Sequence, residues 1–107
     1  MERIRVDVDT WGYDINVSTG INLTGNTQLE LRFRRADGTV IVRNKTANGV
    51  TDNGAPLLGV IHYRDVLVDA LWHVPGDVKI VPAVTYSNGY YESPEPMKVE
   101  VVERFLG

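Results

Sequence analysis

The chain contains no cysteine. Disulfide bridges, thiolate nucleophiles, iron–sulfur clusters and cysteine-ligated zinc are therefore excluded. Positive charge is also scarce, because 11 Lys and Arg residues face 14 Asp and Glu residues and leave a formal net charge of −3. A mildly acidic protein gains little from the counterions that nucleic acid releases on binding, so we expect no nucleic-acid partner.

Long apolar runs are missing as well. The opening segment MERIRVDVDT alternates charged and apolar residues and lacks the apolar centre of a secretory signal. No stretch approaches the roughly 20 apolar residues of a membrane-spanning helix, so we expect no membrane partner. If Met1 is the native start, the protein is made in a cytoplasm. Its 107 residues predict one domain over 1–107, with a core large enough to be stable without disulfide bonds.

What the sequence does contain is alternation with a period of two. The segment LELRFRRADGTVIVRNKT, residues 29–46, alternates apolar and polar side chains on both sides of Asp37-Gly38. Such alternation is typical of a half-buried strand, and Asp-Gly favours a tight turn because glycine accepts positive φ. We therefore predict a β-hairpin, with Val40 and Val42 continuing its buried face.

Similar patterns predict further strands over residues 4–8, 13–17, 57–64, 78–86 and 97–101. The segment 57–64 is apolar on both faces and is expected as a central strand, whereas Pro82 favours an edge or a bulge. Residues 65–75 predict one helical turn or an irregular crossover. About seven short strands, with turn signals about every 8–12 residues, favour an all-β antiparallel β-sandwich, with a closed small barrel as the alternative.

Three stretches together resemble a known family. They are NLTGNTQLELRFRRADGT at residues 22–39, Pro75-Gly76, and MKVEVV at residues 97–102. Their order and turn chemistry are similar to the immunoglobulin-like domains of bacteriophage virion proteins, such as the N-terminal domain of phage baseplate upper proteins. The likeness spans roughly residues 20–102, with Ala36 where that family usually has proline and Val78 where it often has an aromatic residue.

The resemblance implies an immunoglobulin-like sandwich that serves as a non-enzymatic structural or assembly subunit of a phage particle, in its tail, baseplate, neck or head surface. It implies that the partners are other virion proteins and copies of the chain itself, and that the location is the virion. Phage proteins are assembled in the host cytoplasm and need neither an export signal nor disulfides. The alternative function is a carbohydrate- or host-receptor-binding module, with a surface glycan as partner.

Two histidines are the only candidate nitrogen ligands for a metal. A zinc site would need both His62 and His73 together with carboxylates such as Asp65 or Asp69, because cysteine is absent. The simpler interpretation is two structural or surface histidines, so we expect no metal and no cofactor.

Other combinations of reactive side chains are equally weak. Three serines lie in turn-like stretches without a nucleophile-elbow motif: Ser18, Ser87 and Ser93. Two acidic pairs have the residue types that glycoside hydrolysis uses: Asp7 with Asp9, and Glu92 with Glu95. The acids of residues 9–14 and 51–54 suit calcium but are usual turn formers. We therefore expect no catalytic residues and no enzyme.

Aromatic residues near the expected loops are better candidates for a function. Trp and Tyr bring large rigid surfaces with one polar group and are frequent in protein interfaces. The partner-contact candidates are Trp11, Tyr13, Tyr90 and Tyr91. We expect Tyr90 and Tyr91 to lie in a loop, and Trp72 to belong to the core.

Overall fold

The computed structural model describes residues 4–93 and 96–103. Its strands are β1 (Ile4–Asp7), β2 (Asp14–Ser18), β3 (Asn26–Arg34), β4 (Val40–Asn44), β5 (Val60–Arg64), β6 (Gly76–Tyr86), β7 (Gly89–Glu92) and β8 (Met97–Val102). Three short helical segments join them: α1 (Lys45–Asn48), η1 (Pro56–Leu58) and η2 (Leu67–Asp69). None of the described helices is long and apolar enough to span a membrane.

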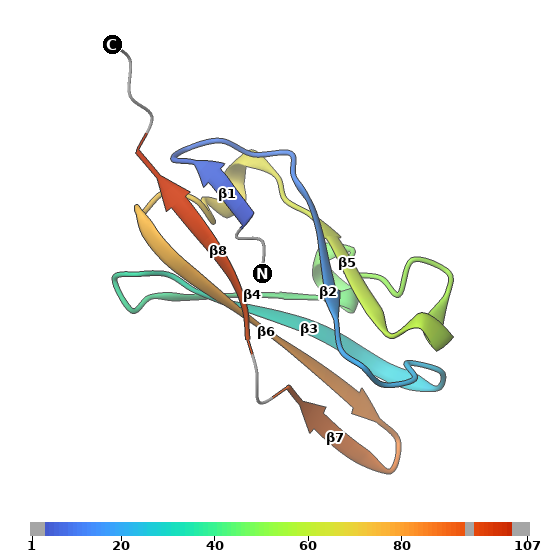
Figure 1. The fold of residues 1–107 in the computed structure, drawn as a ribbon. Helices are drawn as coiled ribbons and strands as arrows, with labels where there is room; N and C mark the ends of the chain where they lie inside the picture. Colours follow the sequence, from blue (N-terminus) through green and yellow to red (C-terminus); the bar gives the residue numbers. More distant parts are fainter. Residues whose placement is uncertain (1–3, 94–95, 104–107) are drawn as a thin grey trace.

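The strands form two sheets that face each other (Figure 1). The larger sheet has six strands in the order β1-β8-β6-β3-β4, with β7 paired to the far end of β6, and the smaller sheet pairs β2 with β5. The all-β prediction is confirmed, with eight strands among the described residues rather than about seven. The wholly antiparallel arrangement was wrong at one edge, because β1 runs parallel to β8. Alternation places side chains on faces but does not encode strand direction.

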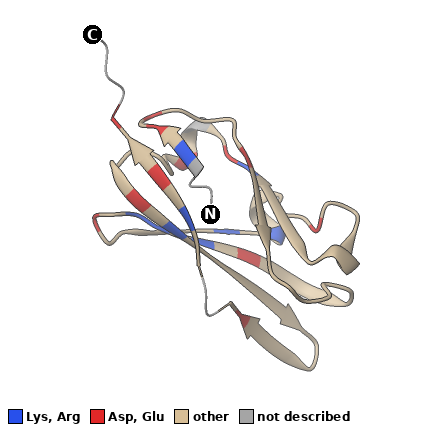
Figure 2. Cartoon of the chain, in the orientation of Figure 1, with Lys and Arg blue, Asp and Glu red and all other residues tan. Residues whose placement is uncertain are grey.

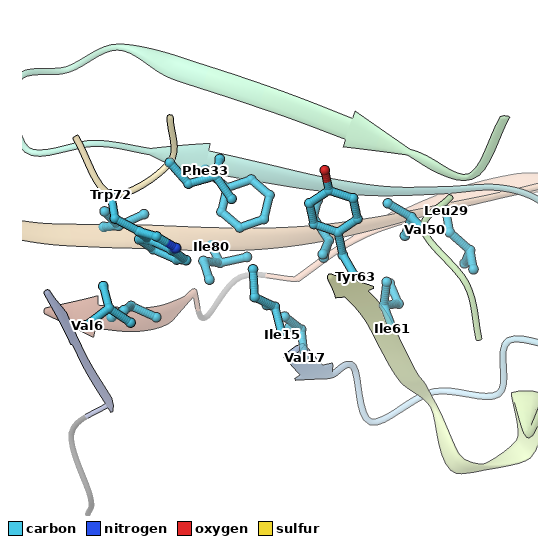
Figure 3. Close-up of a cluster of buried hydrophobic side chains, with 14 of the residues drawn as sticks. Val6, Ile15, Val17, Leu29, Phe33, Val50, Ile61, Tyr63, Trp72 and Ile80 are labelled. Carbon is cyan, nitrogen blue, oxygen red and sulfur yellow. The ribbon is translucent and has the colours of Figure 1, made fainter. Parts of the chain in front are cut away.

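The core lies between the two sheets (Figure 3). Both sheets contribute fully or nearly fully buried side chains, among them Val17, Ile61, Phe33 and Ile80. Trp72 enters the same core after η2 and is 1% exposed, which confirms its predicted place. Its ring meets Phe33 edge-on with centroids 6.4 Å apart. Alternate positions of β2, β3, β5, β6 and β8 thus supply one continuous apolar layer.

The predicted hairpin of residues 29–46 forms from β3 and β4, but β4 faces the other way from the prediction. Phe33 pairs with Ile41, so Val40 and Val42 lie opposite arginines on the outer face and are 54% and 41% exposed. The turn between Arg34 and Val40 holds an odd number of residues, so Val40 pairs with the outward-facing Arg34. A turn one residue longer or shorter would shift the register and place Val40 and Val42 on the buried face. The buried face of the hairpin therefore continues through Ile41.

Pro82 lies in an interior strand rather than at an edge, contrary to the prediction. It pairs with Leu31 of β3 on one side of β6. On the other side its carbonyl accepts a hydrogen bond from the Ser93 N–H, 3.1 Å away. This is where β7 ends at Glu92 and before β8 begins at Met97. The missing N–H of proline therefore costs no ladder hydrogen bond at this position.

The segment 57–64 is not the central strand that its apolar residues predict. Its first part forms η1, which leaves Leu57 76% and Leu58 72% exposed, and only Val60–Arg64 is a strand, in the smaller sheet. Proline at the start of η1 and Gly59 at its end, with φ of 69°, stop the extended chain from beginning earlier. The segment 65–75 contains the predicted helical turn as η2.

The turn at Gly59 gives a test of local packing. A Cβ at Gly59 would collide with the backbone oxygen of Ile21, whereas a Cβ added at Gly54, where φ is +73°, would meet no atom within 4 Å. We expect Gly54→Ala to cost about 1–2 kcal/mol from its left-handed backbone. Gly59→Ala should cost about 1–3 kcal/mol more, because the backbone must move. Urea unfolding of both variants measures the difference, and equal losses would contradict this account.

Candidate interaction surfaces

The four aromatic candidates do not form one site. Trp11 lies in the loop between β1 and β2 and is 57% exposed, while Tyr90 is 55% exposed on β7. These positions lie at opposite ends of the large sheet, because β1 neighbours the start of β6 through β8, and β7 pairs with its end. Tyr90 and Tyr91 belong to a strand rather than to the predicted loop, because the turn is confined to Ser87 and Asn88.

Three of these aromatics make contacts within the molecule. The Tyr13 ring packs edge-on against Trp72, with centroids 6.3 Å apart, and its hydroxyl is 2.8 Å from the Thr10 hydroxyl. The Tyr91 hydroxyl donates to the Thr19 carbonyl, and the Tyr90 hydroxyl accepts from the Arg32 guanidinium at 3.0 Å. Trp11 has the largest exposed fraction of the four and no polar contact of its indole among the described residues.

Two buried carboxylates organise the chain around η2. Asp65 is 2% exposed and accepts hydrogen bonds from the Tyr13 backbone N–H at 2.5 Å and the Trp72 indole N–H at 2.9 Å. Burial raises the pKa of the Asp65 carboxyl, although these two hydrogen bonds oppose the rise. Asp65 thus fixes the loop before β2 to the residue that anchors the core.

The second carboxylate, Asp69, ties η2 to the edge strand β4. It is 5% exposed and accepts from the Arg43 guanidinium at 2.8 Å, the Val66 N–H at 2.9 Å and the Tyr63 hydroxyl. Burial opposes ionisation of Asp69, but these three donors together outweigh it and lower the pKa of the carboxyl. In the same contact, burial and the neighbouring carboxylate raise the pKa of Tyr63 to about 12. Both acids therefore have structural partners.

The histidines lie apart from this buried network. His62 on β5 is 3.1 Å from the Asp14 carboxylate, and His73 is 2.7 Å from that of Asp9. Across residues 4–93 and 96–103, no three His, Asp or Glu side chains gather as metal ligands. A shallow hollow of about 240 Å³ lies beside His73, lined by Asp9, Thr10, Ala70, Trp72 and His73.

The remaining sequence candidates are scattered over the molecule. Ser18 ends β2, Ser87 lies in the β6–β7 turn, and Ser93 follows β7. Asp7 ends β1 on its exposed side, and Asp9 follows it in the loop with φ of 59°. Glu95, the proposed partner of Glu92, lies outside the described residues. Within the loop 51–54, the Asp52 carboxylate accepts from the Gly54 N–H at 3.0 Å, as a turn former does.

A further candidate surface is the free edge of β4. β4 ends the strand order of the large sheet. The N–H and C=O of Asn44 point away from β3, since they bond to the Asn48 side chain and to the Val50 N–H. Backbone groups alternate along a strand, so those of Val40 and Val42 point the same way. The Val42 carbonyl accepts from Arg43 at 2.8 Å, and the other groups of these two valines face outward.

The two strands that end the order β1-β8-β6-β3-β4 differ in chemistry. At β1 the exposed side chains are Arg5 and Asp7, and charges of this kind discourage pairing with another chain. At β4 the exposed side chains are the β-branched Val40 and Val42, next to an open backbone. The adjoining turn η2 is tied to β4 through Arg43. Val68 within η2 is 86% exposed, and Val66 just before it is 47% exposed. The β4 edge therefore combines open hydrogen-bonding groups with exposed apolar surface.

In comparisons with known proteins, no family model, no curated protein and no solved structure matches this chain.

Proposed function

We propose that the chain is a non-enzymatic assembly module that pairs with copies of itself through the free edge of β4. The observation that supports this most directly is the exposure of Val40 and Val42 beside backbone groups that point away from the sheet. Edge strands with these properties add a strand from another chain, and identical chains associate by symmetry. Pairing of two β4 strands would extend the large sheet across both copies and bring the exposed valines next to side chains of the second copy.

We further propose that the two layers are an immunoglobulin-like sandwich and that the assembly is part of a bacteriophage particle. Support comes from the turn and strand pattern of residues 22–39, which resembles phage virion domains. The experiment is to incubate intact phage particles with an antibody against this chain and to image them by negative-stain electron microscopy. We expect the antibody to label the particles. Unlabelled particles from cells that make the chain would contradict the virion proposal and leave the β4 proposal standing.

The β4 proposal predicts that one added charge disrupts self-association. Val42→Lys places an ammonium group on the open edge, so sedimentation equilibrium should show a monomer where the unaltered chain forms larger species. The matched control is Asn16→Lys, which adds the same charge on exposed β2 and should leave association unchanged. A wild-type chain that stays monomeric at high concentration, or equal effects of both variants, would overturn the proposal.

One observation favours the alternative of glycan recognition. Trp11 is largely exposed and follows Thr10, which lines the hollow beside His73 and Asp9. An aromatic face beside polar groups suits a sugar ring. Binding of the isolated chain to glycans, lost in Trp11→Ala, would decide for this alternative.

A further inference from the structure

Three cationic residues stand at paired positions on neighbouring strands of the large sheet, whose Lys and Arg positions are blue in Figure 2. Arg34 of β3 pairs in register with Lys79 of β6, and Lys79 pairs with Lys98 of β8. Residues directly opposite each other share one face, with Cβ atoms about 4.5–5.5 Å apart. We call Arg34, Lys79 and Lys98 the cationic row.

Among the residues that the structure describes, the side chains of the cationic row have no acidic partner in an ion pair. All three are exposed, and within the described part of the chain none of them makes an ion pair or a side-chain hydrogen bond. By contrast, the neighbouring Arg32 is held by Glu30 at 2.6 Å and Glu92 at 2.7 Å. Like charges directly opposite on a sheet destabilise it. The three like charges therefore repel one another, and within the described residues no ion pair or side-chain hydrogen bond of the row offsets that repulsion.

The row is also narrow and bordered on both sides. Asp77 and Glu100 form the next paired row along β6 and β8, and the Arg32 network borders the other side. One end opens into a shallow hollow of about 230 Å³, lined by Arg34, Arg35, Ala36, Gly38, Asp77 and Lys79. A broad polyanion such as a nucleic-acid backbone or an anionic membrane would meet the acidic borders. A single line of carboxylates would fit between them.

We propose that the cationic row docks an acidic polypeptide segment of a partner protein, whose Asp and Glu side chains pair with Arg34, Lys79 and Lys98. This surface lies on the face of the sheet and is separate from the β4 edge, so it adds a second contact to the proposed assembly function. Complementary charge fixes the register of a contact and speeds the encounter more than it adds affinity. We therefore expect weak binding that declines steeply with salt.

The test is a titration of the whole chain with hexaglutamate peptide at low salt, in which binding is monitored through the NMR chemical shifts of the backbone amides. We expect the shifts to cluster at Arg34, Lys79 and Lys98, and the double variant K79Q/K98Q to weaken binding at least fivefold. The matched control is K45Q/R64Q, which removes two exposed cations elsewhere and should change binding by less than twofold. Parallel titrations with inorganic phosphate and with hexathymidylate show whether the cationic row prefers carboxylate or phosphate groups.

A stability measurement accompanies this titration. Neutralising the central cation in Lys79→Gln should raise the Tm by about 1–5 °C, because it removes repulsion from both neighbours. A lowered Tm would show that the row is not a cost to the fold and would contradict the reasoning. Equal weakening by both double variants, no shifts with hexaglutamate, or tighter binding of hexathymidylate or phosphate at the same residues would overturn the proposal.

Discussion

Replacing Trp72 with alanine should lower the free energy of unfolding by about 3–5 kcal/mol. The indole is 1% exposed and touches Phe33 and Tyr13 edge-on, so its loss opens a cavity at the centre of the core. It also removes the N–H that donates to the buried Asp65 carboxylate, which would be left with one donor fewer. Urea unfolding followed by far-UV circular dichroism measures the change.

The other tryptophan is the matched control for this experiment. Trp11 is 57% exposed, and Trp11→Ala should change the free energy of unfolding by no more than about 0.5 kcal/mol. Fluorescence gives a second readout, because the variant that keeps only Trp72 should emit at shorter wavelength than the one that keeps only Trp11. Similar stability losses in both variants would contradict the placement of Trp72 in the core.

The second large effect is expected at Asp69. Asp69→Ala should cost about 3 kcal/mol, because it leaves the Tyr63 hydroxyl, the Val66 N–H and Arg43 without their acceptor. The control is Asp14→Ala, which removes an exposed carboxylate beside His62 and Arg64 and should cost about 0–1 kcal/mol. Unfolding in urea at neutral pH compares the two variants.

The same residue should shape the response to acid. The pKa of Asp69 is lowered in the folded chain, so its stabilising contribution is present above the unfolded pKa, near 3.8, and is lost as the pH falls through the lower folded pKa. The raised pKa of Asp65 works in the opposite sense, since its contribution is present below the unfolded pKa and declines as pH rises. As the pH is lowered below 4, the free energy of unfolding of Asp69→Ala should therefore fall less than that of the wild type. An unchanged acid profile would contradict this assignment.

Much of the fold follows from patterns in the sequence. The alternation of Leu29, Leu31 and Phe33 and the Asp37-Gly38 turn predict the β3–β4 hairpin correctly. Local patterns gave the wrong side for Val40 and Val42, because the orientation of β4 depends on the length of the turn and on the pairing of Phe33 with Ile41. Strand direction at β1 depends on the partner across the sheet and has no signature in residues 4–8.

The candidate surfaces were harder to predict, because exposure is a tertiary property. Leu57 and Leu58 are apolar yet exposed, since the proline and glycine around them form a short helical turn in place of a strand. Asp65 and Asp69 have the residue type of metal ligands, but the structure surrounds both carboxylates with hydrogen-bond donors. The segment RDVLVDALW does carry a signal of burial, because its two acids lie on either side of an apolar stretch and the segment ends in a tryptophan. The role of the four aromatic candidates stays a prediction.

The parallel pair β1 and β8 bears on the order in which the chain acquires its structure. β8 lies between β1 and β6, so residues 4–7 have no neighbour in the sheet until residues 97–102 are available. During translation, β1 therefore cannot pair until almost all of the described chain has left the ribosome. Contacts between such distant residues slow folding, so the β1–β8 pair is expected to form late.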